Sequence, residues 1–339
     1  MNGTDWSVVS EGVRIQRLSL GLGPLGNLYK VVSEDEAQAT LQAWWDSRLR
    51  CFDVAPLYGY GIAETRLGRF LAGRERSSFV VSTKVGRPLR QGAEPDPTIL
   101  VDGEPIFRGT PPGVNPVFDY SEAGIRSCLE ASQRRLGLDR IDIVYVHDPD
   151  RHLWQALDEA VPVLCRLQQD GLIGAIGVGT GSVATALAFV REAPIQCVML
   201  AGRFTLLEQE ALRELLPLCL ERHVGVVAVG VLGSGFLADP RPGAHYDYEP
   251  TADAALLERA RSIARLCSEY GVPLKAAAIQ YPATHSAVAS VAIGASTEAH
   301  AREGLQSYEL PIPPDLWRRL EAEGLVGIEA SAVKYQTGS

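Results

Sequence analysis

Hydrophobic residues change their spacing repeatedly along this chain of 339 residues. Short, nearly continuous apolar runs rich in valine and isoleucine alternate with stretches in which apolar residues recur every three or four positions. The runs are typical of buried strands, and the periodic stretches are typical of amphipathic helices. Eight runs predict strands, near residues 17–21, 51–53, 79–84, 141–147, 173–178, 196–200, 224–229 and 290–293.

Polar residues mark where two of the intervening helices begin. Ser33 and Glu36 have the spacing of a capping box, so we expect a helix from there to about residue 49. Asp119 and Glu122 also suggest a capping box and predict a second helix that ends before Gly137. That helix would bury one face, formed by Ile125, Cys128, Leu129, Ser132 and Leu136.

Strands that are apolar on both sides and covered by helices indicate a parallel sheet. Eight of them in a chain of this length predict an α/β fold, a closed (β/α)8 TIM barrel, as a single domain over residues 1–339. Residues 266–281 predict more than one helix, and residues 313–325 predict an extra C-terminal helix. The proline- and glycine-rich segment 86–118 has no period. Because it follows the third strand, on the face where barrel active sites form, we expect it to line a substrate pocket.

Composition and charge argue against several other classes of protein. The formal net charge of −9 argues against a nucleic-acid partner, whose phosphates require a basic surface. No apolar run reaches the roughly 20 residues that span a bilayer, and the first residues do not resemble a signal peptide. We therefore expect no membrane partner. The six cysteines are scattered, so neither a metal site nor disulfides are expected, and a reducing, cytoplasmic setting fits best. The oligomeric state stays open, because the sequence does not identify an exposed apolar helix.

Four side chains of complementary chemistry lie at or just beyond the ends of predicted strands. Asp53 ends the second strand, Lys84 the third and His147 the fourth, and Tyr58 follows Asp53 by five residues. A tyrosine phenol has a pKa of about 10, and a neighbouring ammonium lowers that pKa. Asp53 would hold Lys84, His147 would bind the substrate oxygen, and Tyr58 would act as acid in reduction and as base in oxidation. Each residue alone is compatible with a structural role, but the four together favour a catalytic site.

The surroundings of these four residues resemble the aldo-keto reductase family, and the resemblance covers residues 18–325. The motifs that carry it are residues 52–59 (FDVAPLYG), 64–68 (ETRLG), 82–86 (STKVG) and 144–148 (VYVHD). Within the family, residues 23–29 (GPLGNLY), 136–142 (LGLDRID) and 200–207 (LAGRFTLL) are similar to bacterial aldose 1-dehydrogenases and pyridoxal 4-dehydrogenase. The resemblance implies that Asp53, Tyr58, Lys84 and His147 form a catalytic tetrad. It also implies hydride transfer between a nicotinamide cofactor and a small-molecule substrate.

The resemblance further implies where the cofactor lies. The chain has no GxGxxG motif opening a βαβ unit, and in a barrel the phosphates are expected on the loops after the seventh and eighth strands. The residues expected to contact the cofactor are Gly23, Asp53, Gly179, Thr180, Gly230, Leu232, Ser234, Gly235, Gly294, Ser296, His300 and Glu303.

Two departures from the family pattern concern the cofactor. Relatives that use NADP carry a lysine and an arginine where this chain has Gly294 and His300, so we expect NAD to be preferred over NADP unless Arg302 supplies the missing charge. The polar residues that hold the nicotinamide carboxamide in many relatives are missing around Gly181 and Ala201. Thr180 or Ser182 could replace one of those contacts.

Several functions therefore stay open. The leading hypothesis is an NAD-dependent dehydrogenase of a sugar hemiacetal or a similar alcohol. An NADPH-dependent reductase of aldehydes or ketones would use the same tetrad in the opposite direction, and a sensor or channel subunit could bind the cofactor without turnover. A glycosidase would need two carboxylates across the pocket, and Asp53 and Asp148 are the candidate pair. Asp53 is better explained as the partner of Lys84.

Overall fold

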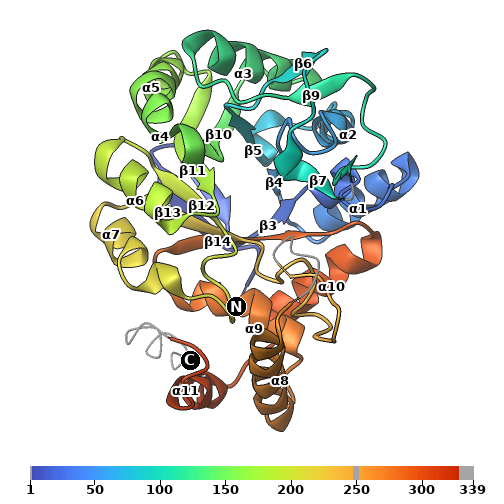
Figure 1. Ribbon diagram of the computed structural model, residues 1–339, viewed down its shortest axis with the longest axis vertical. Coiled ribbons are helices and arrows are strands. Elements are labelled where there is room, and N and C mark those ends of the chain that lie inside the picture. The colour runs from blue at the N-terminus through green and yellow to red at the C-terminus, as the bar shows by residue number, and fades with distance from the viewer. Residues whose placement is uncertain (1, 102, 247–251, 328–339) are drawn as a thin grey trace.

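The computed structural model describes residues 2–101, 103–246 and 252–327. Eight parallel strands form a closed barrel in chain order, and the last strand pairs with the first (Figure 1). They are β3 Leu18–Gly21, β4 Cys51–Asp53, β5 Val80–Val85, β10 Ile141–His147, β11 Ile173–Thr180, β12 Cys197–Ala201, β13 Gly225–Val229 and β14 Val288–Gly294. The predicted (β/α)8 barrel is confirmed, and each predicted strand lies within three residues of its observed bounds.

Helices surround the barrel (Figure 1). They are α1 Glu34–Asp46, α2 Ile62–Leu71, α3 Glu122–Leu136, α4 Leu153–Gln155, α5 Val161–Gln169, α6 Val183–Glu192, α7 Leu215–Glu221, α8 Ala254–Glu269, α9 Leu274–Gln280, α10 Glu298–Glu309 and α11 Pro314–Ala322. The prediction of more than one helix within 266–281 is confirmed, since α8 ends and α9 lies there. The extra C-terminal helix is α11, which packs against α8. None of the helices in the described part of the chain is both long enough and apolar enough to cross a bilayer.

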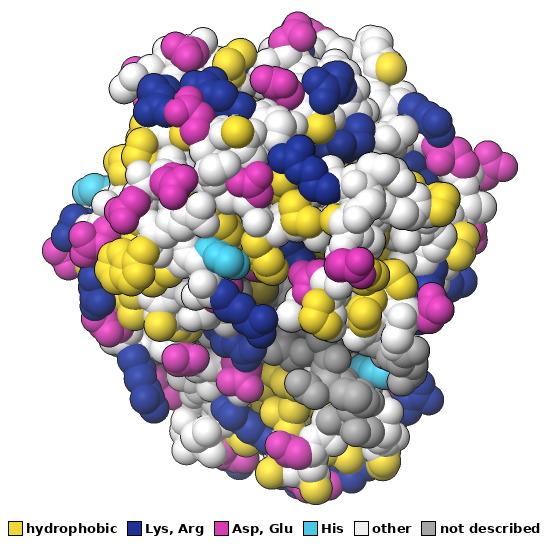
Figure 2. All heavy atoms as spheres, turned by 45° about the horizontal axis from the view of Figure 1, so that its top comes forward, with side chains coloured by type: hydrophobic (Ala, Val, Ile, Leu, Met, Phe, Trp, Pro, Cys, Tyr) yellow, Lys and Arg dark blue, Asp and Glu magenta, His cyan; other side chains and the backbone are white. Residues whose placement is uncertain are grey.

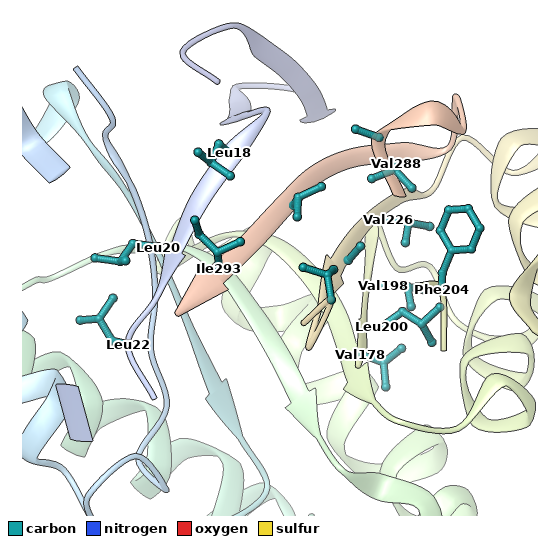
Figure 3. Close-up of a cluster of buried hydrophobic side chains, with 14 of the residues drawn as sticks. Leu18, Leu20, Leu22, Val178, Val198, Leu200, Phe204, Val226, Val288 and Ile293 are labelled. Carbon is teal, nitrogen blue, oxygen red and sulfur yellow. The ribbon is translucent and has the colours of Figure 1, made fainter. Parts of the chain in front are cut away.

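The barrel strands bury both of their faces. Alternate residues such as Val198 and Leu200 of β12 point outward into the layer beneath the helices, where Figure 3 shows them beside Phe204. Their neighbours Cys197 and Met199 belong to a separate cluster inside the barrel. Because successive side chains of a strand point to opposite faces, burial on both faces explains why these strands read as continuous apolar runs.

An N-terminal hairpin closes the barrel at the end opposite the carboxyl ends of the strands. Its strands, β1 Trp6–Ser10 and β2 Val13–Gln16, pair antiparallel. Val9, Val13 and Ile15 pack with the inward-facing residues of the barrel strands. The hairpin was not predicted, because two strands of four or five residues give only a weak sequence pattern.

The two predicted helix starts had different outcomes. At α1, Ser33 Oγ accepts from the Glu36 amide at 3.2 Å and Glu36 accepts from the Ser33 amide at 3.0 Å, so the capping box is confirmed. At α3 the predicted capping box of Asp119 and Glu122 is wrong, because the N-cap is Ser121. Asp119 instead accepts from the hydroxyl of Ser121 at 2.6 Å and so orients the true cap. The predicted buried face of α3 is confirmed: Ile125, Cys128, Leu129, Ser132 and Leu136.

The long segment 86–118 folds over the carboxyl ends of the strands. Its described residues form four short strands in two antiparallel pairs. These are β6 Leu89–Gln91 with β9 Val114–Pro116, and β7 Leu100–Val101 with β8 Glu104–Pro105. On the face of the molecule seen in Figure 2, acidic and basic side chains are intermingled around the hollow beside this segment.

Candidate active site

The barrel brings the four predicted catalytic residues together. Asp53 and His147 are the last residues of β4 and β10, and Lys84 lies near the end of β5, between those two strands in the barrel. Tyr58 lies in the loop after β4, and its ring is edge-on to the imidazole of His147 with 6.4 Å between ring centroids. The placement follows from strand order, since carboxyl ends of neighbouring parallel strands meet on one face.

Lys84 and Asp53 form a buried ion pair. Lys84 Nζ lies 2.7 Å from Asp53 Oδ2, and the two side chains are 2% and 6% exposed. The ammonium also donates to the carbonyl of Val54 at 3.1 Å, and Asp53 Oδ1 accepts from the hydroxyl of Ser82 at 2.7 Å. Burial alone would lower the pKa of Lys84, but the attraction of Asp53 and Tyr58 outweighs burial and raises that pKa. Lys84 is therefore a fixed positive charge.

Tyr58 lies beside that charge, with Lys84 Nζ 4.6 Å from the centroid of its ring. Burial raises the pKa of the Tyr58 phenol, and Lys84 opposes this increase. The sequence led us to expect a lowered pKa. The direction of the lysine's effect agrees with that expectation, but burial is the larger effect, so the net shift is upward. Tyr58 is thus protonated at neutral pH and ready to donate, while Lys84 stabilises the phenolate once the proton has left.

His147 is neutral in the folded protein. Its side chain is buried, and burial, assisted by the positive charges of Lys84 and Arg87, holds its pKa well below the usual value of 6.5. Nε2 lies 3.5 Å from Asp148 Oδ2, whereas Nδ1 is buried and has no hydrogen-bond partner among the described residues. The nearby carboxylate favours the tautomer that carries its proton on Nε2. That proton can be donated to a substrate oxygen.

A pocket of about 440 Å³ opens over Tyr58, Lys84 and His147. Much of its wall comes from segment 86–118, as the sequence predicted for that segment. The lining from this segment is Arg87, Thr98, Ile99, Leu100, Ile106 and Phe107. The Phe107 ring contacts Tyr58, with centroids 5.8 Å apart. A mostly apolar wall with a few polar groups is typical of a small-molecule site.

Arg87 anchors segment 86–118 to the end of β10. Its guanidinium lies 2.6 Å from Asp96 Oδ2 and 2.9 Å from Asp148 Oδ2, and the side chain is 4% exposed. It also lies over the ring of Phe118, 4.6 Å from the centroid. Sequence reasoning did not identify Arg87, although its place three residues after Lys84 was a usable signal.

A second cavity, a cleft of about 480 Å³, lies against the ends of β13, β14 and β3 and shares Tyr58 with the pocket. Eight of the predicted cofactor contacts line it: Asp53, Gly230, Leu232, Ser234, Gly235, Gly294, Ser296 and His300. The loop after β13 has positive φ angles at Gly230, Gly233, Ser234 and Gly235. The amides of Gly233 and Gly235 donate to the carbonyls of Gly230 and Leu232 at 2.9 and 3.1 Å and fold the loop into tight turns, and its glycines allow a phosphate to approach the backbone closely. The cleft therefore suits a dinucleotide.

Four predicted cofactor contacts lie elsewhere. Gly179 and Thr180 line the substrate pocket rather than the cleft. Gly23 is absent from the lining of both cavities, and so is Glu303, whose carboxylate pairs with Lys275 at 2.8 Å. Lys30, which sequence reasoning missed, does line the cleft.

The polar groups suggested as carboxamide partners already have bonds within the protein. Thr180 Oγ1 donates to Asp150 at 2.7 Å, and Ser182 caps α6 by accepting from the amide of Thr185 at 3.2 Å. Gly181, Ala201 and Arg203 line the pocket beside them. Arg203 Nε donates to the carbonyl of Gly181 at 2.8 Å.

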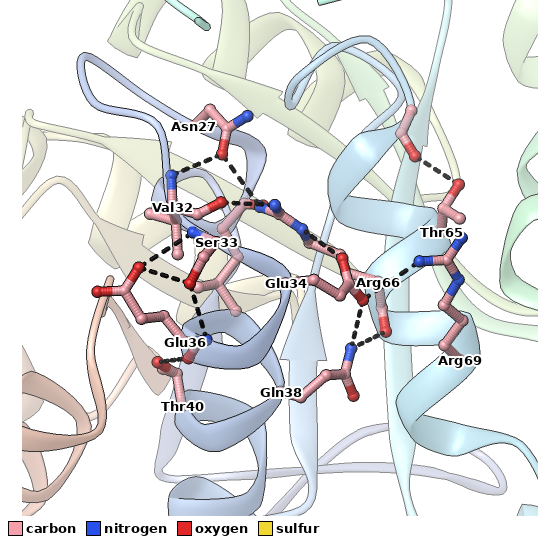
Figure 4. A network of polar contacts seen from close by, with 12 residues as sticks. Asn27, Val32, Ser33, Glu34, Glu36, Gln38, Thr40, Thr65, Arg66 and Arg69 are labelled. Carbon is pink, nitrogen blue, oxygen red and sulfur yellow. Dashed lines mark hydrogen bonds and ion pairs between the residues drawn. The ribbon is translucent and has the colours of Figure 1, made fainter. Parts of the chain in front are cut away.

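A buried arginine holds the segment between β3 and α1 against the cleft. Arg66 of α2 donates to the carbonyls of Leu25 at 2.6 Å and Val32 at 2.7 Å. It also donates to Asn27 Oδ1 at 3.1 Å and to Glu34 at 3.2 Å, as Figure 4 shows. The guanidinium thereby fixes the ends of the segment that lines the cleft.

Comparison with known proteins agrees with this geometry. The sequence profile of the Aldo/keto reductase family matches residues 17–323. The chain belongs to the aldo/keto reductase family. It is therefore an NAD(P)-dependent oxidoreductase. The glycosidase alternative is not supported, because Asp53 is paired with Lys84 and Asp148 with Arg87.

Relatives within the aldo/keto reductase family cover nearly the whole chain. D-threo-aldose 1-dehydrogenase of Pseudomonas sp is 42% identical, over 96% of this chain and 99% of that protein. Pyridoxal 4-dehydrogenase of Microbacterium luteolum is 39% identical, over 93% of this chain and 96% of that protein. Glycerol dehydrogenase from Gluconobacter oxydans has a similar fold, with a TM-score of 0.76 at 22% identity, covering 96% of this chain and 98% of that one.

Proposed function

We propose that this protein is an NAD-dependent dehydrogenase that oxidises the hemiacetal carbon of an aldose, or a similar alcohol. The observation that carries the proposal is the position of Tyr58. It lines both the dinucleotide-sized cleft and the substrate pocket, and it lies beside the buried pair of Lys84 and Asp53. The two relatives named for D-threo-aldose and pyridoxal are both called dehydrogenases, which supports oxidation of a sugar or an alcohol.

A nicotinamide dinucleotide would be held in the cleft by the loop after β13, from Gly230 to Gly235, and by Gly294 and Ser296 after β14, and when bound it would supply hydride-transfer chemistry. His147, being neutral, donates from Nε2 to the reacting oxygen and orients the substrate. Tyr58 moves the proton of that oxygen: as the phenol it donates the proton in reduction, and in oxidation it takes the proton after the phenol has first released its own proton to solvent. Lys84 lowers the free energy of the phenolate, and Asp53 keeps Lys84 in place.

The proposed preference for NAD rests on the part of the cleft that is lined by Gly294, Ser296 and His300, which we call the far end of the cleft. A β-carbon added to Gly294 would lie 2.9 Å from Pro24 Cγ, so a lysine cannot replace this glycine without moving that turn. His300 contacts Ser296 at 3.2 Å, and Arg302 is paired with Glu298 at 2.8 Å and does not line the cleft. Position 294 and Arg302 therefore offer no cation to a 2′-phosphate, unlike the lysine and arginine of NADP-dependent relatives, and Lys30 is the lysine of the cleft lining.

The test is an activity screen of aldoses, pyridoxal and simple aldehydes in both directions, with NAD and NADP and their reduced forms. We expect turnover of at least one aldose with NAD, and loss of turnover in Tyr58→Phe with the affinity for NADH kept. A strong preference for NADP would instead favour an NADPH-dependent reductase. No turnover by wild type on any substrate, and no difference between wild type and Tyr58→Phe, would defeat both enzymatic hypotheses and favour a sensor or channel subunit.

A variant tests the cofactor proposal separately. His300→Arg restores one cation at the far end of the cleft, and we expect kcat/KM with NADP to rise by about tenfold while kcat/KM with NAD changes little. The matched control is Arg302→Ala. Because Arg302 is paired with Glu298 outside the cleft, its loss leaves both values unchanged. A fall in NADP activity in that control would show that Arg302 supplies the missing charge.

A further inference from the structure

Asp148 lies directly after His147 and faces the substrate pocket. Its backbone is in the left-handed region, with φ 45° and ψ 53°. Most residues avoid this conformation, although aspartate tolerates it better than others. The turn directs the side chain back toward the imidazole, so that Oδ2 lies 3.5 Å from His147 Nε2.

Two buried side chains hold this turn in place. The hydroxyl of Tyr120 lies 2.6 Å from the carbonyl oxygen of His147 and 3.0 Å from that of Asp148. Arg87 donates to Asp148 Oδ2 at 2.9 Å. Both Tyr120 and Arg87 are almost completely buried, so the carboxylate is fixed in position before any substrate binds.

Part of the carboxylate remains available to a ligand. The Asp148 side chain is 39% exposed, in contrast to the 4% of Arg87 and the 10% of Asp96. The described residues place both close contacts, from Arg87 and from His147, on Oδ2, and no hydrogen bond from any of them reaches Oδ1. Arg87 already has a buried carboxylate partner in Asp96 at 2.6 Å, so charge balance of Arg87 does not by itself require Asp148.

We propose that the Asp148 carboxylate accepts a hydrogen bond from a substrate hydroxyl on the carbon next to the reacting carbon, so that the pocket selects polyhydroxylated substrates. This inference rests on the proposed function. A reacting oxygen that accepts from His147 Nε2 lies within hydrogen-bond distance of that nitrogen, and the carboxylate lies 3.5 Å from the same nitrogen. A hydroxyl on the adjacent carbon therefore comes within reach of Asp148. Much of the rest of the lining is apolar, as with Leu57, Ile99 and Phe107, so Asp148 is a favourable partner for that hydroxyl.

The test compares two substrates that differ in one hydroxyl. The probes are D-arabinose and 2-deoxy-D-ribose, which is its 2-deoxy form. If another aldose proves the best in the screen, it and its 2-deoxy form are used instead. For wild type we expect kcat/KM for the aldose to exceed that for the deoxy sugar by about 10- to 100-fold, the effect of a hydrogen bond to a charged group. In Asp148→Asn we expect this ratio to fall at least about fivefold, because an amide oxygen is a weaker acceptor than a carboxylate.

Using a ratio separates substrate recognition from damage to His147. A disturbed imidazole lowers kcat/KM for both sugars alike and leaves their ratio unchanged, and this result would overturn the proposal. The matched control is Asp96→Asn, which removes the other carboxylate on Arg87 at a residue that does not itself line the pocket. Asparagine can still cap the short turn that Asp96 begins. We expect this control to keep the wild-type ratio of the two kcat/KM values. If the ratio falls as far as in Asp148→Asn, the effect belongs to Arg87, and direct recognition of the hydroxyl by Asp148 is overturned.

The outcomes also separate this inference from the proposed function. If wild type oxidises no aldose, the proposed function fails and the inference fails with it. If wild type oxidises aldoses and Asp148→Asn keeps the same ratio, only the inference fails. Binding of NADH, followed by its fluorescence, serves as a folding check, since Asp148 is absent from the cofactor cleft.

Discussion

Gly26→Ala tests how closely the backbone of Tyr58 must be positioned. Gly26 ends a short turn after β3, and a β-carbon added there would lie 2.5 Å from the carbonyl carbon of Tyr58 and 2.8 Å from the amide nitrogen of Gly59. Carbon atoms in contact are normally about 3.5–4.0 Å apart, so the two segments must separate by about 1 Å. Both neighbours are backbone, so no side-chain rotation can relieve the contact.

The magnitude follows from this geometry. Overpacking of a buried site costs about 1–3 kcal/mol, which is less than the total stability of about 5–15 kcal/mol, so the variant should fold. A misplacement of about 1 Å in a reacting group lowers activity by about 100-fold. We therefore expect Gly26→Ala to lose about two orders of magnitude in kcat/KM and about 1–3 kcal/mol in the free energy of unfolding.

The assay combines steady-state kinetics on the best substrate with urea unfolding. The control is Gly23→Ala in the same turn, where the added carbon would have its nearest neighbour at 3.9 Å, the Cδ2 of Leu28. We expect this control to stay within about threefold of wild-type activity, because 3.9 Å is an ordinary contact. Activity of Gly26→Ala within about threefold of wild type would refute the reasoning, since Tyr58 would then tolerate the displacement.

Three further predictions concern the charges around the site. Lys84→Met leaves Asp53 buried without its counter-charge. We therefore expect the free energy of unfolding, measured with urea, to fall by about 3–5 kcal/mol and turnover to be lost. A free energy of unfolding equal to that of wild type would contradict this. The lowered pKa of His147 means that the unfolded chain takes up this proton first as the pH falls below 6.5. The stability that His147 contributes is therefore fully present above that pH and decreases below it. When thermal unfolding is followed between about pH 5 and 8, the unfolding temperature should decrease less with falling pH in His147→Gln than in wild type. An equal decrease in both proteins would contradict this. Arg66→Lys removes the planar donor set that holds the segment after β3, and we expect the Kd for NADH, measured by fluorescence, to rise about tenfold with a smaller change in kcat. An unchanged Kd would show that this segment does not position the cofactor.

The periodicity of the sequence determined the fold and much of the site. Eight apolar runs separated by helical patterns left few alternatives to a closed parallel barrel, because each strand needs both faces covered. The barrel then determined that Asp53, Lys84 and His147 meet, since residues at the ends of neighbouring strands lie side by side whatever their distance in sequence.

Tertiary structure decided what depends on contacts between distant segments. It showed that burial outweighs Lys84 in the pKa of Tyr58, that Ser121 rather than Asp119 caps α3, and that Glu303 is paired with Lys275 outside the cleft. It also brought Arg87 against Asp148, in a loop where no period guides prediction. The physical reason is that strand and helix periods are local properties of the chain. Desolvation and ion pairing depend on which groups the completed fold places within a few ångströms.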